Sequence, residues 1–440
     1  MICFKYAQIT IVFYLDFNYK YLMQKNQKLN KWLWKWHFIA GMVSLPFILI
    51  LSITGIIYLF KADYEAPKQK DVKEVIVQGT PISLQEQWKI AKTHATKKPN
   101  AVIIPTATNQ ATEFVSGRFG GKSSLYVNPY TGEVSGVITP KDSVMFTVRK
   151  LHGELLLGGF GTKIVELIAC WMIVLILTGI YVWWPGRGWQ LKGFFIPRTG
   201  VDKRTFYRDL HSITGFWVSI LLMMILAGGL PWTDVFGSNF KTLQKVTNTG
   251  YPSTWDARKL QSNTTEAPQD FISLDQMMVK ATSLNLSGDV AITFPKGPNG
   301  VYSVSNTNPM DLASQKKVHF DAYTGKQLLA NHWDDVGILM QGRMWFMAFH
   351  QGEFGTWNWV LMLLTSIALT VMSIAAIVSY VLRKKPKKWG VPKVPASFKV
   401  GYGIVVLLII LSVVFPLFGG SLIIIIGVEY WRKKRKIASI

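Results

Sequence analysis

Residues 151–185, LHGELLLGGFGTKIVELIACWMIVLILTGIYVWWP, join a histidine, a run of glycines and an apolar stretch long enough to cross a membrane. A similar segment starts at residue 349 and reads FHQGEFGTWNWVLMLLTSIALTVMSIAAIVSYVLRKKP. Matching places hold a histidine and then a Phe-Gly-Thr triplet, which are His152 with Phe160-Gly161-Thr162 and His350 with Phe354-Gly355-Thr356. Two segments of this build predict a chain made of two related halves.

The composition is that of an integral membrane protein. The chain has 440 residues, of which 49% are hydrophobic and 13% aromatic, and its formal net charge is +23. The basic residues cluster beside apolar stretches, which the positive-inside rule explains, so we expect no nucleic-acid partner. The two cysteines, Cys3 and Cys170, are far apart in the sequence, so neither a disulfide framework nor a thiolate metal site is expected.

Hydropathy predicts an α-helical membrane protein with two extracytoplasmic α+β domains and an internal duplication of span, domain and span. The loops after residues 185 and 382 are rich in Lys and Arg, which places them in the cytoplasm. The expected order is a cytoplasmic segment (1–36), a span (37–60), an α+β domain (61–148), a span with an outer-face segment (149–185), a cytoplasmic loop (186–210), a span (211–231), an α+β domain (232–343), a span with an outer-face segment (344–382), a cytoplasmic loop (383–399), an apolar transmembrane hairpin (400–430) and a basic tail (431–440).

The two ends of the chain are harder to interpret. Residues 1–22 are apolar but interrupted by charges, so we assign them no function and expect translation to begin at Met23. The block 400–430 contains Pro416 and has basic flanks, which favours a hairpin that returns to the cytoplasm. One tilted helix is the alternative.

The two α+β regions also share local sequence. Ser83, followed by Glu86, predicts the start of a helix, because a serine and a glutamate at this spacing form a capping box. Strands are expected at Ala101–Pro105, Thr112–Phe119 and Ser124–Asn128. The aligned pieces are Ile82-Ser83-Leu84-Gln85 with Ile272-Ser273-Leu274-Asp275, and Tyr130-Thr131-Gly132 with Tyr323-Thr324-Gly325.

Four histidines stand at matching places in the two halves. His37 and His211 open the spans that begin in the cytoplasm, whereas His152 and His350 open the segments that return from the outer face. Packing of two related halves brings each pair face to face. Two imidazoles facing each other in an apolar bundle can hold the iron of a b-type haem between them. One histidine near a membrane interface is ordinary, but four at matching places predict the axial iron ligands of two haems.

The depth of the outer histidines depends on the shape of their segments. From His152 to Trp184 a straight helix would be about 48 Å long, whereas a hydrocarbon core is about 30 Å thick. His152 and His350 are therefore expected at or above the outer face, unless the glycines at 158–161 bend the segment back. The other histidines, His94, His319 and His332, are expected to be solvated.

Charged residues near the outer histidines are candidates for supporting roles. Arg149, Lys150 and Arg343 could bind haem propionates or an anionic substrate, and a solvated interface charge is the equally weighted alternative. Glu154 and Glu353 could orient the imidazoles as hydrogen-bond acceptors. The sequence contains no GxGxxG or Walker motif, so the reductant must come from elsewhere, either a quinol or a soluble cytoplasmic reductase.

Several motifs together resemble a known family. Its features here are Leu151-His152-Gly153-Glu154, Gly158-Gly159-Phe160-Gly161, Thr178-Gly179-Ile180-Tyr181 and Trp183-Trp184-Pro185. They resemble the PepSY-associated transmembrane helix family over residues 32–386, and the Tyr-Thr-Gly turns with their helices resemble PepSY domains. The second half lacks the Trp-Trp-Pro motif. The resemblance implies an iron-regulated protein of the bacterial inner membrane, with the four histidines as haem ligands and the periplasmic PepSY-like domains covering a substrate site.

The expected activity is reduction of a ferric siderophore or other ferric chelate in the periplasm, with electrons passed outward through haem and iron released as Fe(II). One alternative is a membrane-anchored PepSY protein that restrains an extracytoplasmic protease or other partner. A transporter of the chelate is a third hypothesis, which the scarcity of charged residues in the spans disfavours.

Overall fold

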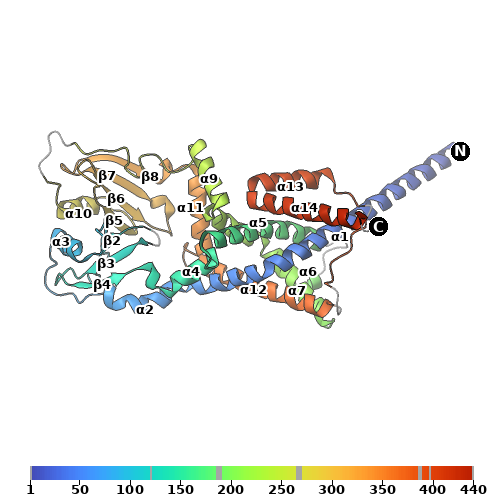
Figure 1. Cartoon of the computed structure of the whole chain (residues 1–440), viewed down its shortest axis with the longest axis horizontal. Helices are drawn as coiled ribbons and strands as arrows, with labels where there is room; N and C mark the ends of the chain where they lie inside the picture. Colours follow the sequence, from blue (N-terminus) through green and yellow to red (C-terminus); the bar gives the residue numbers. More distant parts are fainter. Residues whose placement is uncertain are drawn as a thin grey trace.

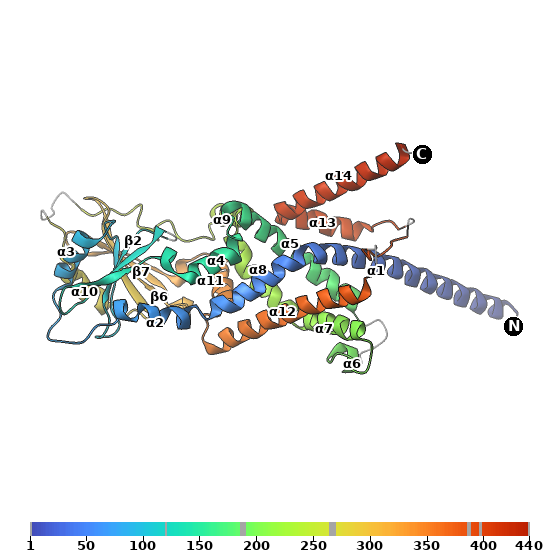
Figure 2. The same cartoon turned by 60° about the horizontal axis from the view of Figure 1, so that its bottom comes forward.

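The computed structural model describes residues 2–118, 121–184, 191–263, 270–384, 389–395 and 398–438, with side chains from residue 27 onward except those of residues 191, 433 and 436–438. The molecule is elongated, with a sheet domain at one end and a helical bundle at the other (Figure 1). Two short helices, α4 (Val144–Glu154) and α11 (Ile338–Gln351), lie between these two parts in both cartoon views (Figure 2).

The bundle is built from long apolar helices. They are α1 (Ile2–Leu59), α5 (Gly158–Trp183), α12 (Thr356–Arg383) and a bent pair, α7 (Lys203–Trp217) with α8 (Ser219–Gly229), which continues into the 3-10 turn η3 (Leu230–Trp232). Within the described residues, three helices are long and apolar enough to cross a membrane, and the bent pair makes a fourth span if it is counted as one. Its bend is 59°. These elements correspond to the four predicted spans.

One buried carboxylate fixes a further helix to the bundle. Glu166 of α5 is fully buried and accepts hydrogen bonds from the backbone N–H groups of Val235 and Phe236, both at 2.9 Å. These residues begin α9 (Val235–Val246), so the carboxylate caps its N-terminus and meets the positive end of its dipole. Lys163 and Asp234 form an ion pair of 2.6 Å beside it.

The C-terminal apolar block consists of two helices, not one. Helix α13 (Tyr402–Val414) ends at Phe415, and α14 (Pro416–Ala438) turns back beside it (Figure 1). Proline at the first position of α14 needs no N–H partner, which suits it to this break. Phe418 is buried against Trp171 of α5, with ring centroids 5.0 Å apart. The side of the membrane on which the hairpin ends stays a prediction.

The two predicted α+β regions share a single antiparallel sheet. Its order is β4-β3-β2-β1-β5-β6-β7-β8, and the two regions join where β1 pairs with β5, with Val102 opposite Ile292. The strands are β1 (Ala101–Ile103), β2 (Thr112–Ser116), β3 (Ser123–Val127), β4 (Val134–Ile138), β5 (Asp289–Thr293), β6 (Val301–Thr307), β7 (Lys316–Asp321) and β8 (Gln327–His332). The expectation of two separate domains therefore misses this continuous sheet.

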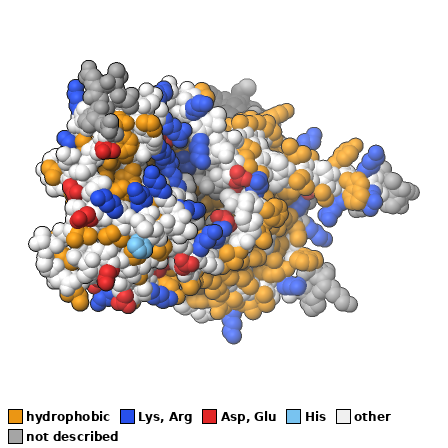
Figure 3. All heavy atoms as spheres, turned by 60° about the vertical axis from the view of Figure 1, so that its left-hand side comes forward, with side chains coloured by type: hydrophobic (Ala, Val, Ile, Leu, Met, Phe, Trp, Pro, Cys, Tyr) orange, Lys and Arg blue, Asp and Glu red, His pale blue; other side chains and the backbone are white. Residues whose placement is uncertain are grey.

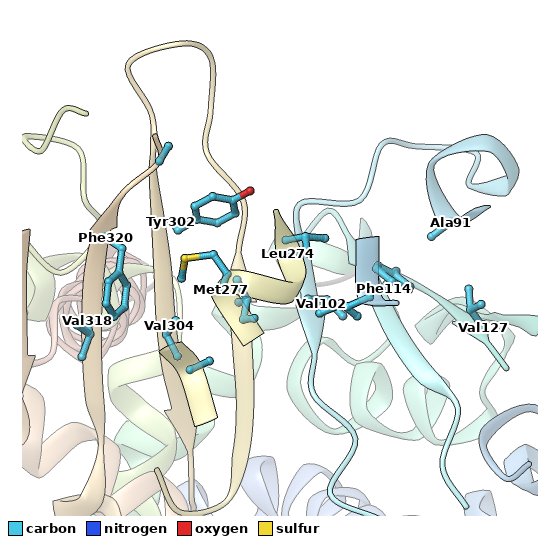
Figure 4. Packing of buried hydrophobic residues seen from close by; sticks show 14 of the residues in the cluster. Ala91, Val102, Phe114, Val127, Leu274, Met277, Tyr302, Val304, Val318 and Phe320 are labelled. Atoms are coloured by element: carbon cyan, nitrogen blue, oxygen red, sulfur yellow. The ribbon is translucent and has the colours of Figure 1, made fainter. Parts of the chain in front are cut away.

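Helices α3 (Leu84–His94) and α10 (Leu274–Ser283) pack on the sheet and against each other. Their apolar side chains and those of the strands form one core, which Figure 4 shows around Met277, Phe114 and Phe320. Both helices begin with a capping box, at Ser83 and at Ser273. The capping box at Ser83 was predicted from the sequence.

The two helix starts also cap each other. Asp275 accepts a hydrogen bond of 2.7 Å from the N–H of Leu84, and Gln85 accepts one of 2.9 Å from the N–H of Leu274. The aligned sequences Ile82–Gln85 and Ile272–Asp275 thus meet at the centre of the domain and supply each other's missing acceptors.

Short elements complete the chain. They are α2 (Lys61–Lys73), α6 (Leu191–Phe194), η2 (Pro140–Asp142), η4 (Leu312–Ser314) and η5 (Trp333–Asp335). Of the three remaining histidines, His94 and His332 are exposed as expected, but the expectation is wrong for His319. Its side chain is fully buried in β7 and bonds Ser303 Oγ at 2.8 Å through Nδ1. Burial, with the nearby Lys317 charge, lowers the pKa of His319 to about 4.

Candidate functional site

The outer pair of histidines comes together between α4 and α11. The ring centroids of His152 and His350 are 6.2 Å apart, and their planes are inclined by 84°. Both residues are partly exposed, although they lie among packed helices.

The inner pair has nearly the same geometry. His37 of α1 and His211 of α7 have ring centroids 6.3 Å apart and planes inclined by 69°. These rings are also only partly buried. The sequence thus predicted both pairings, and the chain brings together residues that are far apart in sequence.

Hydrogen bonds fix the tautomer of the inner rings. His211 Nδ1 lies 3.1 Å from the carbonyl oxygen of Met372, which can only accept, so Nδ1 carries the proton. His37 Nδ1 lies 3.0 Å from Thr178 Oγ1, and this hydroxyl donates to the carbonyl of Val174 at 2.7 Å. The hydroxyl therefore accepts from His37, and the Nε2 lone pair of each neutral ring is left for a ligand.

The outer rings are held in the same way. His350 Nδ1 donates to the carbonyl oxygen of Ile225 at 2.8 Å. His152 Nδ1 lies 3.0 Å from Thr54 Oγ1, whose own proton goes to Ile50 at 2.7 Å. In the part of the chain that the structure describes, none of the four rings makes a hydrogen bond through Nε2. Hydrogen-bonded Nδ1 and open Nε2 is the state in which histidine binds a metal.

The two histidines of each pair are contacted by residues at corresponding positions of the two halves of the chain. When the two Phe-Gly-Thr triplets are aligned, Met372 stands opposite Thr178, so equivalent places supply the acceptors for the inner rings. When His37 is aligned with His211, Gly55 corresponds to Gly229. A Cβ at Gly55 would lie 3.7 Å from the His152 ring, and one at Gly229 would lie 3.5 Å from the His350 ring.

A break in the return segment brings His152 down to the bundle. Helix α4 ends with Leu155 and Leu156 in the left-handed region, at φ 49° and 59°, and α5 begins at Gly158. Gly161 then packs on the end of α4 so closely that a Cβ there would overlap the Glu154 carbonyl. The segment therefore folds back, and the His152 ring reaches Thr54 inside the span of α1. It does not stand above the end of that helix.

Helix α1 contacts both histidine pairs. His37 is part of α1, and Thr54, which holds His152, lies farther along it. At a rise of 1.5 Å per residue, the two sites are about 25 Å apart along the helix axis. Because the bend brings the outer pair inward, both sites lie within one bundle.

The charged candidates are placed differently from one another. Arg149 is exposed over the Phe146 ring, and Lys150 pairs with Glu154 at 3.2 Å. Glu353 lies 3.8 Å from Lys61. Among the described residues, neither glutamate bonds a histidine, and the acceptors are the threonines and carbonyls instead. Arg343 is buried.

A cavity of about 420 Å³ lies between the sheet domain, α1, α2 and α4. Arg149, one helical turn from His152, forms part of its wall. Its charged and phenolic lining is Lys61, Lys73, Lys122 and Arg149, with Glu65, Glu113, Tyr58 and Tyr126. Basic side chains are prominent on the sheet domain, whereas hydrophobic ones cover the bundle (Figure 3). The excess of basic groups suits the cavity to an anionic ligand of small-molecule size.

Sequence reasoning missed Thr54 and Thr178, the two hydroxyl acceptors. Each is followed by a glycine inside an apolar span, Gly55 or Gly179, and each of these glycines lies against a histidine ring. A Cβ at Gly179 would be 3.0 Å from the His37 ring. The repeated Thr-Gly pair is the signal that could have identified them. Gly41 and Gly215 pack near Leu175 and Met372.

The comparison with known families agrees with this architecture. No curated protein matches the chain. A family model described as PepSY-associated TM region matches residues 34–383, which include the candidate spans, the shared sheet and all four paired histidines. Because the match covers most of the chain, this membrane protein belongs to the family of the PepSY-associated TM region.

Proposed function

We propose that the protein is a haem-containing reductase of the bacterial inner membrane that passes electrons outward to a ferric siderophore or similar ferric chelate. The two imidazole pairs with open Nε2 atoms are the observation that carries the proposal. In this proposal each pair binds one b-type haem, and the sheet domain lies in the periplasm.

The separation of the rings fits one metal atom held between two imidazoles. Two metal–imidazole bonds of about 2 Å and a ring radius of about 1.1 Å add up to about 6.2 Å between ring centroids. The measured separations are 6.2 and 6.3 Å. Steep angles between the ring planes are compatible, because each imidazole can rotate about its bond to the metal.

Two ligands suit a metal whose other ligands belong to a macrocycle. Within the described residues, no group of three or more His, Cys, Asp or Glu side chains is placed to hold a bare metal ion. A bound haem supplies one-electron chemistry. The chain's own part is to hold the rings through Thr54, Thr178, Ile225 and Met372 and to keep the sites within apolar helices.

The arrangement of the two halves supports the proposed duplication and orientation. The sheet has the same order when read outward from β1 and from β5, and the helix starts cap each other reciprocally. Basic loops at the opposite end of the bundle favour the cytoplasm there. The basic cavity is the proposed chelate site, where Fe(III) would gain one electron and leave as Fe(II).

Reduction can be tested directly. The full chain, purified in detergent, is reduced anaerobically with dithionite and freed of excess reagent. It is then mixed with a ferric siderophore and an Fe(II)-trapping dye. We expect the reduced haem spectrum to return to the oxidised form as the dye takes up an equivalent amount of Fe(II).

The matched control is the same chelate without iron, which should leave the spectrum reduced. A protein with no haem spectrum would contradict the proposal and leave the membrane-anchored partner-binding function as the better account. A haem spectrum that ferric chelates do not reoxidise would contradict the substrate but not the haem sites.

A further inference from the structure

Arg343 is a buried arginine whose charge is not compensated by any carboxylate of the described residues. The residue is 7% exposed, and its Nε makes no hydrogen bond. The guanidinium lies over the Trp232 ring, with Cζ 4.1 Å from the centroid. Among the described residues it forms no ion pair. Burial lowers the pKa of Arg343, and Tyr251 raises it, but the guanidinium remains charged at neutral pH. Burying an unpaired charge is costly, so the site is suited to an anion.

The guanidinium lies on the same side of its helix as an outer histidine. Arg343 and His350 are seven residues apart in α11, which is about two turns, so both side chains leave one face. The neighbouring segment, residues 229–232, runs antiparallel to α11. Gly229 lies against the His350 ring, and Trp232, three residues later, lies against Arg343. Arg343 therefore lies on the same face of α11 as His350, about 10 Å along the helix in the direction of the sheet domain.

We propose that Arg343 binds a carboxylate at the edge of the group held by His152 and His350, namely a propionate of the outer haem. This inference rests on the proposed function. The planar guanidinium can donate two parallel hydrogen bonds to a carboxylate, and its contact with the Trp232 ring fixes the orientation of the guanidinium. Arg149 and Lys150 lack this setting, because Arg149 is exposed and Lys150 already pairs with Glu154.

A fixed positive charge beside the outer haem has an electrochemical consequence. It stabilises the reduced iron relative to the oxidised iron, since the oxidised centre carries one more positive charge. Removing the charge should therefore move the midpoint potential of the outer haem to a more negative value. The inner haem, about 25 Å away along α1, should change little.

The test compares full-length Arg343→Gln, Arg343→Lys and wild-type protein in detergent, with Arg118→Gln, a change of an exposed arginine of the sheet domain, as the matched control. Two properties are measured: the optical redox titration and the rate of haem transfer to apomyoglobin. For Arg343→Gln we expect one of the two midpoints to fall and one haem to be lost several-fold faster. Arg343→Lys should keep the potential near that of wild type but lose haem faster. Arg118→Gln should match wild type in both.

Unchanged potentials and transfer rates in Arg343→Gln would overturn the inference, even if its KM for ferric chelate rose, because the anion would then be the substrate. If Arg343→Gln lost both haems through misfolding, Arg343→Lys would decide, and wild-type transfer rates in that variant would count against the proposal. Wild-type protein without haem would overturn the proposed function and this inference together.

Discussion

The two histidine pairs have similar ring separations, but the charged groups beside them are arranged differently. Beside the inner pair, Asp209 is buried two residues before His211 and is paired with Arg198 at 2.7 Å and Arg208 at 3.0 Å. Beside the outer pair, the buried Arg343 has no carboxylate partner among the described residues. Two arginines and one aspartate leave one net positive charge beside the inner pair, and Arg343 contributes one beside the outer pair. The inner arginines are thus already held by a carboxylate, whereas Arg343 is left for the proposed haem propionate.

The pairs also differ in the elements that carry them. The inner rings project from α1 and α7, which belong to the spans, whereas the outer rings project from the short helices α4 and α11. The position of the outer rings thus depends on the breaks between α4 and α5 and between α11 and α12. The outer site should consequently be the more sensitive to changes in loop and glycine residues.

Removing a proposed ligand should have the largest effect. We expect His152→Ala to lose one haem of two and all chelate reduction, because one axial ligand disappears. His37→Ala should lose the other haem but keep an outer haem that dithionite reduces. Haem content and dye-trapped Fe(II) measure both outcomes. His94→Ala, which changes an exposed histidine of the sheet domain, serves as the control. Equal spectra for His152→Ala and wild type would refute the outer pairing.

Gly161→Ala should selectively damage the outer site. Its Cβ would overlap the Glu154 carbonyl, so α4 must shift, at a cost of about 1–3 kcal/mol. We expect occupancy of the outer haem to fall several-fold while the inner haem is retained, as measured by redox titration. Gly159→Ala is the matched control, because a Cβ there meets nothing within 4 Å. Equal outer occupancy in the two variants would show that the bend does not position His152.

Two threonine substitutions distinguish the sites by their acceptors. Thr178→Val removes the hydroxyl acceptor of His37, and Thr54→Val removes the hydroxyl acceptor of His152, with little change in volume. Loss of such a partner typically lowers metal affinity about 10–100-fold. We therefore expect Thr178→Val to weaken only the inner haem and Thr54→Val only the outer one, measured by haem transfer to apomyoglobin. Loss of the same haem in both variants would contradict the assignment.

The smallest effect is expected at the cavity wall. Arg149→Gln removes one positive charge from the lining, so KM for an anionic ferric chelate should rise several-fold, and less so at high salt. The haem spectrum should not change. Lys141→Gln removes an exposed charge outside this lining and should leave KM unaltered. A rise of the same size in both variants would mean that the cavity is not the chelate site.

Sequence patterns predicted those features that depend on local composition. Hydropathy located the spans, the serine and glutamate at Ser83 and Glu86 located a helix start, and matched motifs paired the four histidines. The single sheet was not predicted, because pairing of β1 with β5 joins edges that carry no periodic signal. Burial of His319 was missed for the same reason, since it depends on neighbouring strands.

Backbone conformation explains the other differences. The turn after α4 uses two leucines with positive φ, a conformation that leucine rarely adopts and that tertiary packing must impose. The 59° bend of the third span occurs at Val218, with neither proline nor glycine at the break. Two of the four acceptors are backbone carbonyls, which every residue type possesses. No residue identity in the sequence marks such positions.

The central claim is that each histidine pair binds a haem through two Nε2 atoms. Its most direct test is the haem-to-chain ratio of the purified full-length protein, combined with low-temperature electron paramagnetic resonance. We predict two b-type haems per chain, both low-spin with two imidazole ligands. A protein without haem, or one whose haems are high-spin and five-coordinate, would contradict the account.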